Sequence, residues 1–252
     1  MATKGNTHSN GTISHYDPTF SPTHLTNLWK KCPLLERIHD PKIGVLLDEQ
    51  FTSYNAQGTT GDYVLTQATQ GTAAISTAAP GVLELDCNST TSTQGANLQR
   101  VKSAFVPAAG KHIWAEFKIK IVDTFDKVEL FVGLAEIDTS IIAASAISTS
   151  NHIGWYCVTD DGVLLFGANK ATTAATKAAA TIAEDTYITL GFYVNGVTEI
   201  EQYINGVHTG TSLNHVTANI PTVALYPSFV CQSAGTNDPI MHIAGYRIFQ
   251  LR

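Results

Sequence analysis

Three carboxylates in one apolar segment are the residues best placed for acid–base chemistry. Glu129, Glu136 and Asp138 lie within residues 128–140, which read VELFVGLAEIDTS. Hydrolysis of a glycosidic bond needs two carboxylates on the same face, about 5–5.5 Å apart in retaining enzymes and about 6.5–9.5 Å apart in inverting ones. In a strand, Glu136 and Asp138 share a face and Glu129 points to the opposite one. No third carboxylate completes the arrangement, so we predict a non-enzymatic protein with no catalytic residue.

Other catalytic and metal-binding patterns are absent from the sequence. There is no G-x-S-x-G motif, and the nine histidines show neither H-x-H nor HExxH spacing. Asp160-Asp161-Gly162 offers oxygen ligands for calcium but lacks the D-x-D-x-D-G alternation of a calcium loop, which favours a plain turn. We therefore predict no metal site and no cofactor.

The four cysteines do not form a metal or redox motif, because no two are close enough for C-x-x-C. Cys157 and Cys231 lie inside apolar, strand-like runs, which favours buried free thiols. One disulfide among Cys87, Cys157 and Cys231, between adjacent strands, stays open as an alternative.

Composition excludes several functional classes. The chain has 252 residues, a net charge of −6, and no basic cluster longer than Lys30-Lys31, which argues against nucleic-acid binding. No stretch approaches the roughly 20 apolar residues of a membrane helix, so we expect no membrane partner. Residues 1–17 are polar and lack the apolar core of a secretory signal, so we expect synthesis and folding in a cytoplasm.

The pattern from residue 43 onward is that of short β-strands. Residues 111–123 alternate, with apolar side chains on one face and Trp114, Glu116, Lys118 and Lys120 on the other, as in a half-buried antiparallel strand. Residues 128–137 are apolar on both faces, which indicates a central strand. Asp-Gly and two successive Asn-Gly pairs predict β-hairpins. Residues 140–147 are expected to form a short helix, and 170–183 mostly an extended loop with a strand end.

The first 42 residues are different in character. They carry four prolines and no strand periodicity, and residues 25–32 can form a helical turn or two. We therefore predict an N-terminal arm at 1–42 and a sandwich at 43–252. The arm has too many large apolar side chains for a solvated tail, and we expect it to bind a partner. Those residues are Phe20, Leu25, Leu28, Trp29, Leu34, Leu35 and Ile38.

Several C-terminal runs resemble the concanavalin A-like and laminin-G-like jelly rolls. The runs are ITLGFYVNG (188–196), IEQYINGVH (200–208) and MHIAGYRIF (241–249). WAEFKI (114–119) and FVGLAE (131–136) fit the same layout, and also resemble structural proteins of tailed-phage virions. The resemblance covers about residues 45–252 and implies an all-β, two-sheet antiparallel jelly-roll sandwich. It defines function poorly, because sandwiches of this shape carry many activities.

Two functions fit these observations. The first is a bacteriophage capsid decoration (cement) protein located in the virion, with the major capsid protein and copies of itself as partners. The alternative is a carbohydrate-binding module of a tail fibre or host-recognition protein, in which exposed aromatic side chains contact the glycan. The aromatic candidates are Trp114, Tyr156, Tyr203 and Tyr226, whereas Trp155 beside Cys157 is expected to pack in the core.

Overall fold

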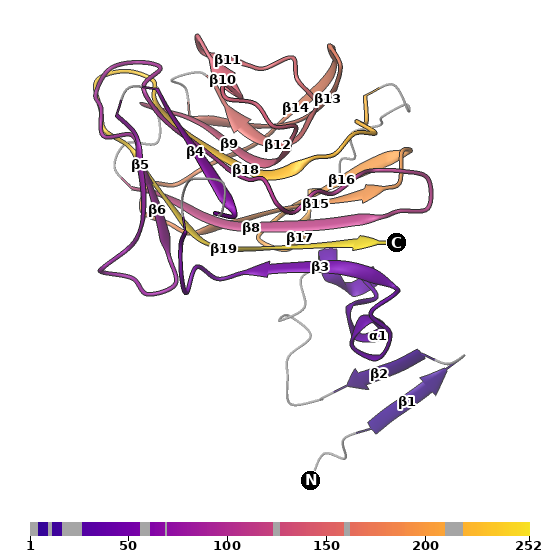
Figure 1. Ribbon diagram of the computed structural model, residues 1–252. Coiled ribbons are helices and arrows are strands. Elements are labelled where there is room, and N and C mark those ends of the chain that lie inside the picture. The colour runs from indigo at the N-terminus through magenta and orange to yellow at the C-terminus, as the bar shows by residue number, and fades with distance from the viewer. Residues whose placement is uncertain are drawn as a thin grey trace.

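The computed structural model describes residues 5–9, 12–16, 27–55, 61–68, 70–122, 127–158, 162–209 and 219–252. Two antiparallel sheets pack face to face, and the predicted jelly-roll sandwich is confirmed (Figure 1). No helix among the described residues is long and apolar enough to cross a membrane.

The first sheet has seven strands in the order β14-β13-β12-β9-β18-β7-β4. Their bounds are Tyr63–Ala68 for β4, Gly95–Arg100 for β7, Val128–Ala135 for β9, His152–Cys157 for β12, Val163–Lys170 for β13, Thr173–Thr181 for β14 and Tyr226–Ser233 for β18. β9 lies at the centre and is buried on both faces, as its sequence predicts.

The second sheet has eight strands, in the order β17-β16-β15-β8-β19-β6-β5 with β3 also paired to β19. Their bounds are Gly44–Glu49 for β3, Thr72–Ile75 for β5, Leu83–Asp86 for β6, Ile113–Val122 for β8, Ile188–Asn195 for β15, Glu199–Ile204 for β16, Val207–His208 for β17 and Ile240–Leu251 for β19. The long β19 pairs with β8 along most of its length.

The alternation of β8 turns one of its faces toward the core between the two sheets and the other toward the outside of the eight-stranded sheet. Its odd-numbered residues from Ile113 to Ile121 are fully buried in the main core, and Lys118 on the other face is exposed. Asn205 and Gly206 have φ of 49° and 73° and join β16 to β17 in a two-residue turn. That geometry is the type I′ turn that an Asn-Gly pair predicts.

Among its described residues, the N-terminal part contains four short elements. β1 (Gly5–Ser9) and β2 (Thr12–Tyr16) form a separate hairpin. The 3-10 helix η2 (Asn27–Lys31) confirms the helical turn predicted at 25–32, and a one-and-a-half-turn helix α1 (Leu34–His39) follows it.

Two local predictions were wrong. Residues 140–147 form no helix but a hairpin of β10 (Ile142–Ala143) and β11 (Ala146–Ile147). An eight-residue helix is only marginally stable by itself, whereas the hairpin places Ile141, Ile142 and Ile147 on the outer surface of the seven-stranded sheet. Residues 173–181 form the edge strand β14 rather than a loop, because β13 offers them a full ladder of pairing.

Candidate functional site

The outer surface of the eight-stranded sheet carries two of the predicted glycan-binding aromatics, and both are covered. Trp114 and Tyr203 are only 4% and 6% exposed. They pack with Leu28 and Trp29 of η2 and with Phe249 of β19 in a cluster separate from the main core. Stacking on a sugar needs an exposed ring face, so neither residue is available as a glycan platform in this structure.

The same cluster contains several of the apolar residues of the predicted N-terminal arm. Leu28 and Trp29 are 1% and 7% exposed, and the half-buried Leu34 packs beside them. A Cβ on Gly191 would lie 2.8 Å from Leu28 Cδ2, so a glycine in β15 makes room for this side chain. Leu28 and Trp29 are thus buried on the chain's own sheet, which corrects their assignment to a partner. Phe20 and Leu25, and the side chains of Leu35 and Ile38, lie outside the described residues.

The remaining aromatic candidates lie on the seven-stranded sheet. Trp155 is fully buried in the main core, as predicted. Tyr156 is 4% exposed beneath the β10–β11 hairpin and its hydroxyl bonds to Thr176 Oγ1 at 2.8 Å, so it is not available to a glycan. Tyr226 at the start of β18 is half-buried, and it alone of the four candidates keeps appreciable exposed surface.

Two of the three carboxylates of the 128–140 segment, Glu136 and Asp138, fix a loop. Glu136 Oε2 accepts a hydrogen bond from Asn151 Nδ2, and Asp138 accepts from Ser140 and Ser148. Burial tends to raise the pKa of Asp138, but these hydrogen bonds outweigh it and hold that pKa below its ordinary value. Glu129 is 1% exposed, and burial raises its pKa. No two of the three form an open pair that could accommodate a substrate.

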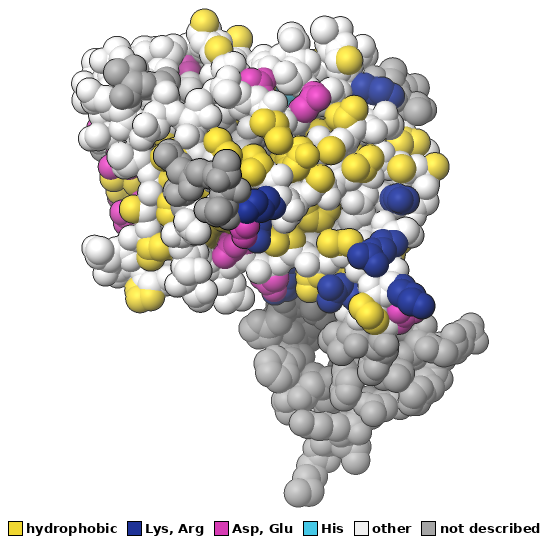
Figure 2. Space-filling model, viewed as in Figure 1, with side chains coloured by type: hydrophobic (Ala, Val, Ile, Leu, Met, Phe, Trp, Pro, Cys, Tyr) yellow, Lys and Arg dark blue, Asp and Glu magenta, His cyan; other side chains and the backbone are white. Residues whose placement is uncertain are grey.

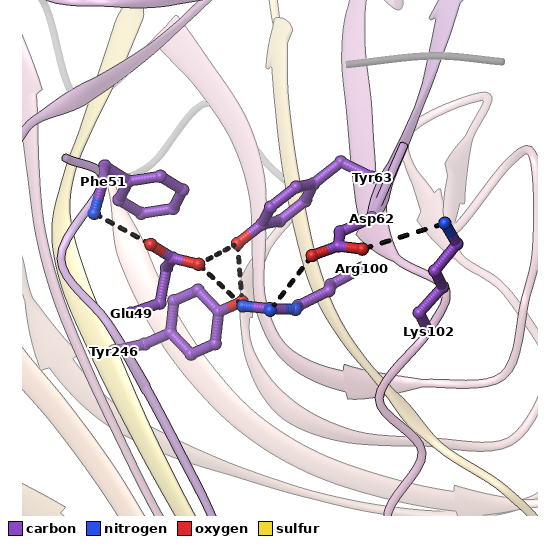
Figure 3. Close-up of polar contacts among 7 residues, drawn as sticks. All are labelled: Glu49, Phe51, Asp62, Tyr63, Arg100, Lys102 and Tyr246. Carbon is purple, nitrogen blue, oxygen red and sulfur yellow. Dashed lines mark hydrogen bonds and ion pairs between the residues drawn. The ribbon is translucent and has the colours of Figure 1, made fainter. Parts of the chain in front are cut away.

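A partly buried polar network joins the two sheets at one edge (Figure 3). Arg100 Nη1 of β7 lies 2.6 Å from Glu49 Oε2 of β3, and Tyr63 of β4 donates to the same carboxylate at 3.2 Å. Tyr246 of β19 bonds to the Tyr63 hydroxyl at 2.7 Å, and burial raises the pKa of Tyr246 to about 12. Phe51, whose φ of 46° is unusual for a bulky residue, donates its N–H to Glu49 Oε1 at 3.0 Å. Because both oxygens of Glu49 accept protein hydrogen bonds, we interpret this network as a connection between the sheets.

A charged pocket of about 240 Å³ lies beside the network. Asp48, Glu116, Lys118 and Arg247 line it together with Glu49 and Tyr246. Arg247 donates to Asp48 Oδ2 from Nη2 at 2.6 Å and from Nε at 2.9 Å, so much of the charge at this pocket is already paired. On the face shown in Figure 2, Lys and Arg side chains form separate spots and no continuous basic patch.

A second pocket, of about 360 Å³, is lined by amides, hydroxyls and one carboxylate. We call it the polar pocket, and its residues are Gln70, Asn88, Ser89, Thr90, Thr91, Gln94 and Asp238. They come from three connections: the one between β4 and β5, the one between β6 and β7, and the one between β18 and β19. Its volume falls within the roughly 300–1,000 Å³ of small-molecule sites.

Hydrogen bonds between and within these loops fix the polar pocket. Asp238 Oδ1 accepts from Ser89 N at 2.8 Å, Ser89 Oγ donates to Gln94 Oε1 at 2.9 Å, and Asn88 Nδ2 donates to Gln70 O at 3.4 Å. Asn88 itself adopts a φ of 50°, which asparagine tolerates better than most residues. At the adjoining end of β6, burial raises the pKa of Asp86, and the negative charges of Asp238 and Glu84 add to the effect. The pocket is therefore preorganised and acidic.

Sequence reasoning missed the polar pocket. The run of Asn88, Ser89, Thr90 and Thr91 marks a loop, but its partners lie about 20 residues before it and about 150 after it. Among the described residues no group of three His, Cys, Asp or Glu side chains could hold a metal ion, and Asp160 and Asp161 lie outside the described part.

Comparison with known proteins gives the fold. No family model and no curated protein sequence matches the chain. Peanut lectin, solved with a nine-residue peptide, is similar with a TM-score of 0.57 at 12% identity, over 83% of this chain and 98% of that one. The sandwich is a lectin-like jelly roll. A protein of unknown function from Shewanella oneidensis MR-1 has a TM-score of 0.57 at 13% identity, over 86% of this chain and 94% of that one.

Lectins and glycan-hydrolysing enzymes both share this fold. An endo-1,3-beta-glucanase from Streptomyces sioyaensis has a TM-score of 0.52 at 9% identity, over 81% of this chain and 95% of that one. At such identities the likeness concerns the fold alone. The matched proteins of known function named above are a plant lectin and a glucanase, not phage virion proteins.

Proposed function

We propose that this protein is a non-catalytic glycan-binding protein and that the polar pocket binds the sugar. The supporting observation is the composition of that pocket: three loops at one end of a lectin-like sandwich bring together two glutamines, an asparagine, an aspartate, a serine and two threonines. Of the two functions considered from the sequence, glycan binding is favoured because the matched folds include several lectins. Capsid decoration has no observation of its own in its favour.

The chemistry of the polar pocket suits a neutral sugar. Each sugar hydroxyl is both donor and acceptor, and amides and hydroxyls offer both functions in return. Asp238 uses Oδ1 to accept from the Ser89 N–H, and its second oxygen can accept from a ligand hydroxyl. Hydrogen bonds to a charged group contribute about 1.5–3 kcal/mol each, so Asp238 should dominate the affinity.

Hydrolysis is disfavoured on the geometry of the carboxylates. A glycosidase needs a free acid and a free base or nucleophile on either side of the bond. Glu136 and Asp138 are bonded to their own loop, and the polar pocket is lined by one carboxylate, Asp238. We therefore expect a bound glycan to be released unchanged.

A glycan array tests the proposal with one variant and one control. Wild-type protein should bind at least one neutral glycan, and Asp238→Asn should weaken that binding about 10-fold or more, because a charged acceptor is lost. Asp62→Asn makes the same chemical change at an exposed carboxylate of the network in Figure 3 and should bind as wild type does. No binding of any neutral glycan by the wild type, or equal affinity of Asp238→Asn, would overturn the proposal, and cleaved products would overturn its non-catalytic part.

A further inference from the structure

Two thiols from opposite sheets meet inside the sandwich. Cys87 directly follows β6 in the eight-stranded sheet, and Cys231 lies on β18 in the seven-stranded sheet, in the other layer of Figure 1. Their Sγ atoms are 3.4 Å apart, and both residues are fully buried. A disulfide needs a separation of about 2.05 Å, so a small shift of the two side chains would bring these sulfurs to bonding distance.

The other two cysteines are placed differently. Cys157 of β12 and Cys231 of β18 both pair with Leu130 of β9, so they are two strands apart, roughly 9–10 Å. That separation exceeds the roughly 7 Å limit between the Cα atoms of a disulfide. Cys32 belongs to the cluster on the outer surface of the eight-stranded sheet. Of the pairings that sequence left open, Cys87 with Cys231 places its two sulfur atoms close together, and Cys157 with Cys231 is excluded by the strand spacing.

The thiol pair lies directly beneath the polar pocket. Pro239 O accepts a hydrogen bond from Cys87 N at 3.3 Å and faces Cys231 Sγ at 3.6 Å. Asp238 precedes that proline, and Asn88 and Ser89 follow Cys87 in the chain. Cys231 is also opposite Ala96 in β7, the strand that follows the pocket loop. A bond between the two sulfurs would therefore tie together the bases of two of the three loops that form the pocket.

We propose that Cys87 and Cys231 form a reversible disulfide that links the two sheets and holds the loops of the polar pocket in their binding conformation. The effect on glycan affinity rests on the proposed function, whereas formation of the bond does not.

The chemistry balances with a small-molecule disulfide such as oxidised glutathione as the oxidant. One cysteine thiolate attacks that disulfide, which forms a mixed disulfide and releases one glutathione. The second cysteine attacks the mixed disulfide, forms the Cys87–Cys231 bond and releases the second glutathione. Two cysteine thiols are oxidised, one disulfide is reduced, and the two protons end on the two glutathione thiols.

The folded structure determines when this exchange takes place. The hydrogen bond to Cys231, together with burial, raises the pKa of Cys87 well above its usual range. Only the thiolate attacks a disulfide, so the closed sandwich reacts slowly. The bond should therefore form while the chain folds in an oxidising environment and, once formed, resist reduction until the sandwich opens.

Thiol counting after refolding tests bond formation. Wild-type protein refolded with oxidised and reduced glutathione, then denatured and alkylated, should keep two of its four thiols, and protein refolded in reductant should keep all four. Cys87→Ala and Cys231→Ala should each keep all three of their remaining thiols. The double variant Cys32→Ala/Cys157→Ala is the matched control and should lose both of its thiols. Four free thiols in the oxidatively refolded wild type would overturn the proposal.

Measurements of stability and of glycan affinity test separately the disulfide and its effect on the polar pocket. The oxidised wild type should unfold at a urea concentration higher by about 1 M than the reduced form, because the cross-link closes a long loop. On the glycan found by the array, the oxidised form should bind several-fold more tightly than the reduced form. Equal affinities would remove the link to the pocket and leave both glycan binding and the disulfide standing. If no glycan binds, the proposed function fails while thiol counting still decides the disulfide.

Discussion

The guanidinium of Arg247 in β19 lies 5.8 Å from the centre of the Trp29 ring in η2. The last strand of the sandwich therefore contacts the helical turn that comes before its first strand, β3. The same guanidinium donates two hydrogen bonds to Asp48 of β3. A cation over an indole ring is attracted to its face, and the ion pair with Asp48 fixes the position of that cation. Trp29 is therefore part of the sandwich in its contacts, although it lies outside it in the sequence.

We predict that Trp29→Ala destabilises the whole sandwich. Replacing a buried tryptophan by alanine costs about 3–5 kcal/mol, and in this protein it would also uncover Trp114 and Tyr203. Urea unfolding followed by circular dichroism measures the loss, and binding of a hydrophobic dye reports the uncovered surface. Lys30→Ala, at the exposed neighbouring position, should stay within about 0.5 kcal/mol of the wild type. Equal stability of the two variants would mean that Trp29 does not hold the sheet and would restore its predicted role toward a partner.

The turn of the β10–β11 hairpin gives a second prediction. Ala144 and Ser145 have φ of 50° and 56°, a conformation that costs a residue with a Cβ roughly 1–2 kcal/mol. Ala144→Gly should therefore stabilise the protein by about 0.5–1 kcal/mol, after allowance for the greater freedom of glycine in the unfolded chain. The measurement is the free energy of unfolding in urea.

Ala143→Gly is the matched control for that change, one residue earlier and inside β10. It should destabilise the protein by about 0.5–1 kcal/mol, because glycine weakens a strand. If both substitutions shift stability in the same direction, the left-handed turn does not carry the strain we assign to it.

The fold was predictable from the sequence where a residue pattern is compatible with only one local structure. The alternation of 111–123 and the unbroken apolar run of 128–135 each determine how many faces of a strand are buried, and the Asn-Gly pair at 205–206 determines its turn. Residues 140–147 were not predictable, because isoleucines at 141, 142 and 147 suit a helix or a hairpin. Only the surface formed by Phe131, Tyr156 and Val230 selects the hairpin.

The candidate site was less predictable than the fold, for a physical reason. Period-two reasoning correctly placed Trp114 on the face opposite the core residues of its strand, but it could not show that Leu28 and Trp29 cover that face. The polar pocket depends on three connections that only the strand order brings together. Likewise, Cys87 and Cys231 are 144 residues apart in the chain, and no spacing motif relates them.

The last prediction concerns acid stability and rests on His152. Its side chain is 4% exposed at the start of β12 and makes T-shaped contacts with the rings of Phe131 and Tyr156. Burial lowers the pKa of His152 from 6.5 to about 4, against the opposing influence of the Ser150 carbonyl and the Asp138 charge. In the unfolded chain the imidazole takes up a proton near pH 6.5, whereas in the folded protein it stays neutral until about pH 4.

Between those two pH values the unfolded state binds more protons, so stability must fall as the pH is lowered from 6.5 to 4, by on the order of 3 kcal/mol in total from this one residue. We expect His152→Asn to remove that part of the slope when free energies of unfolding are measured across this range.

Asp138→Asn should behave differently. The lowered pKa of Asp138 means that its stabilising contribution is present above the ordinary aspartate pKa and is lost only as the pH falls further, so that variant should keep the slope between pH 6.5 and 4. If His152→Asn loses stability on acidification as steeply as the wild type, the slope belongs to groups other than His152.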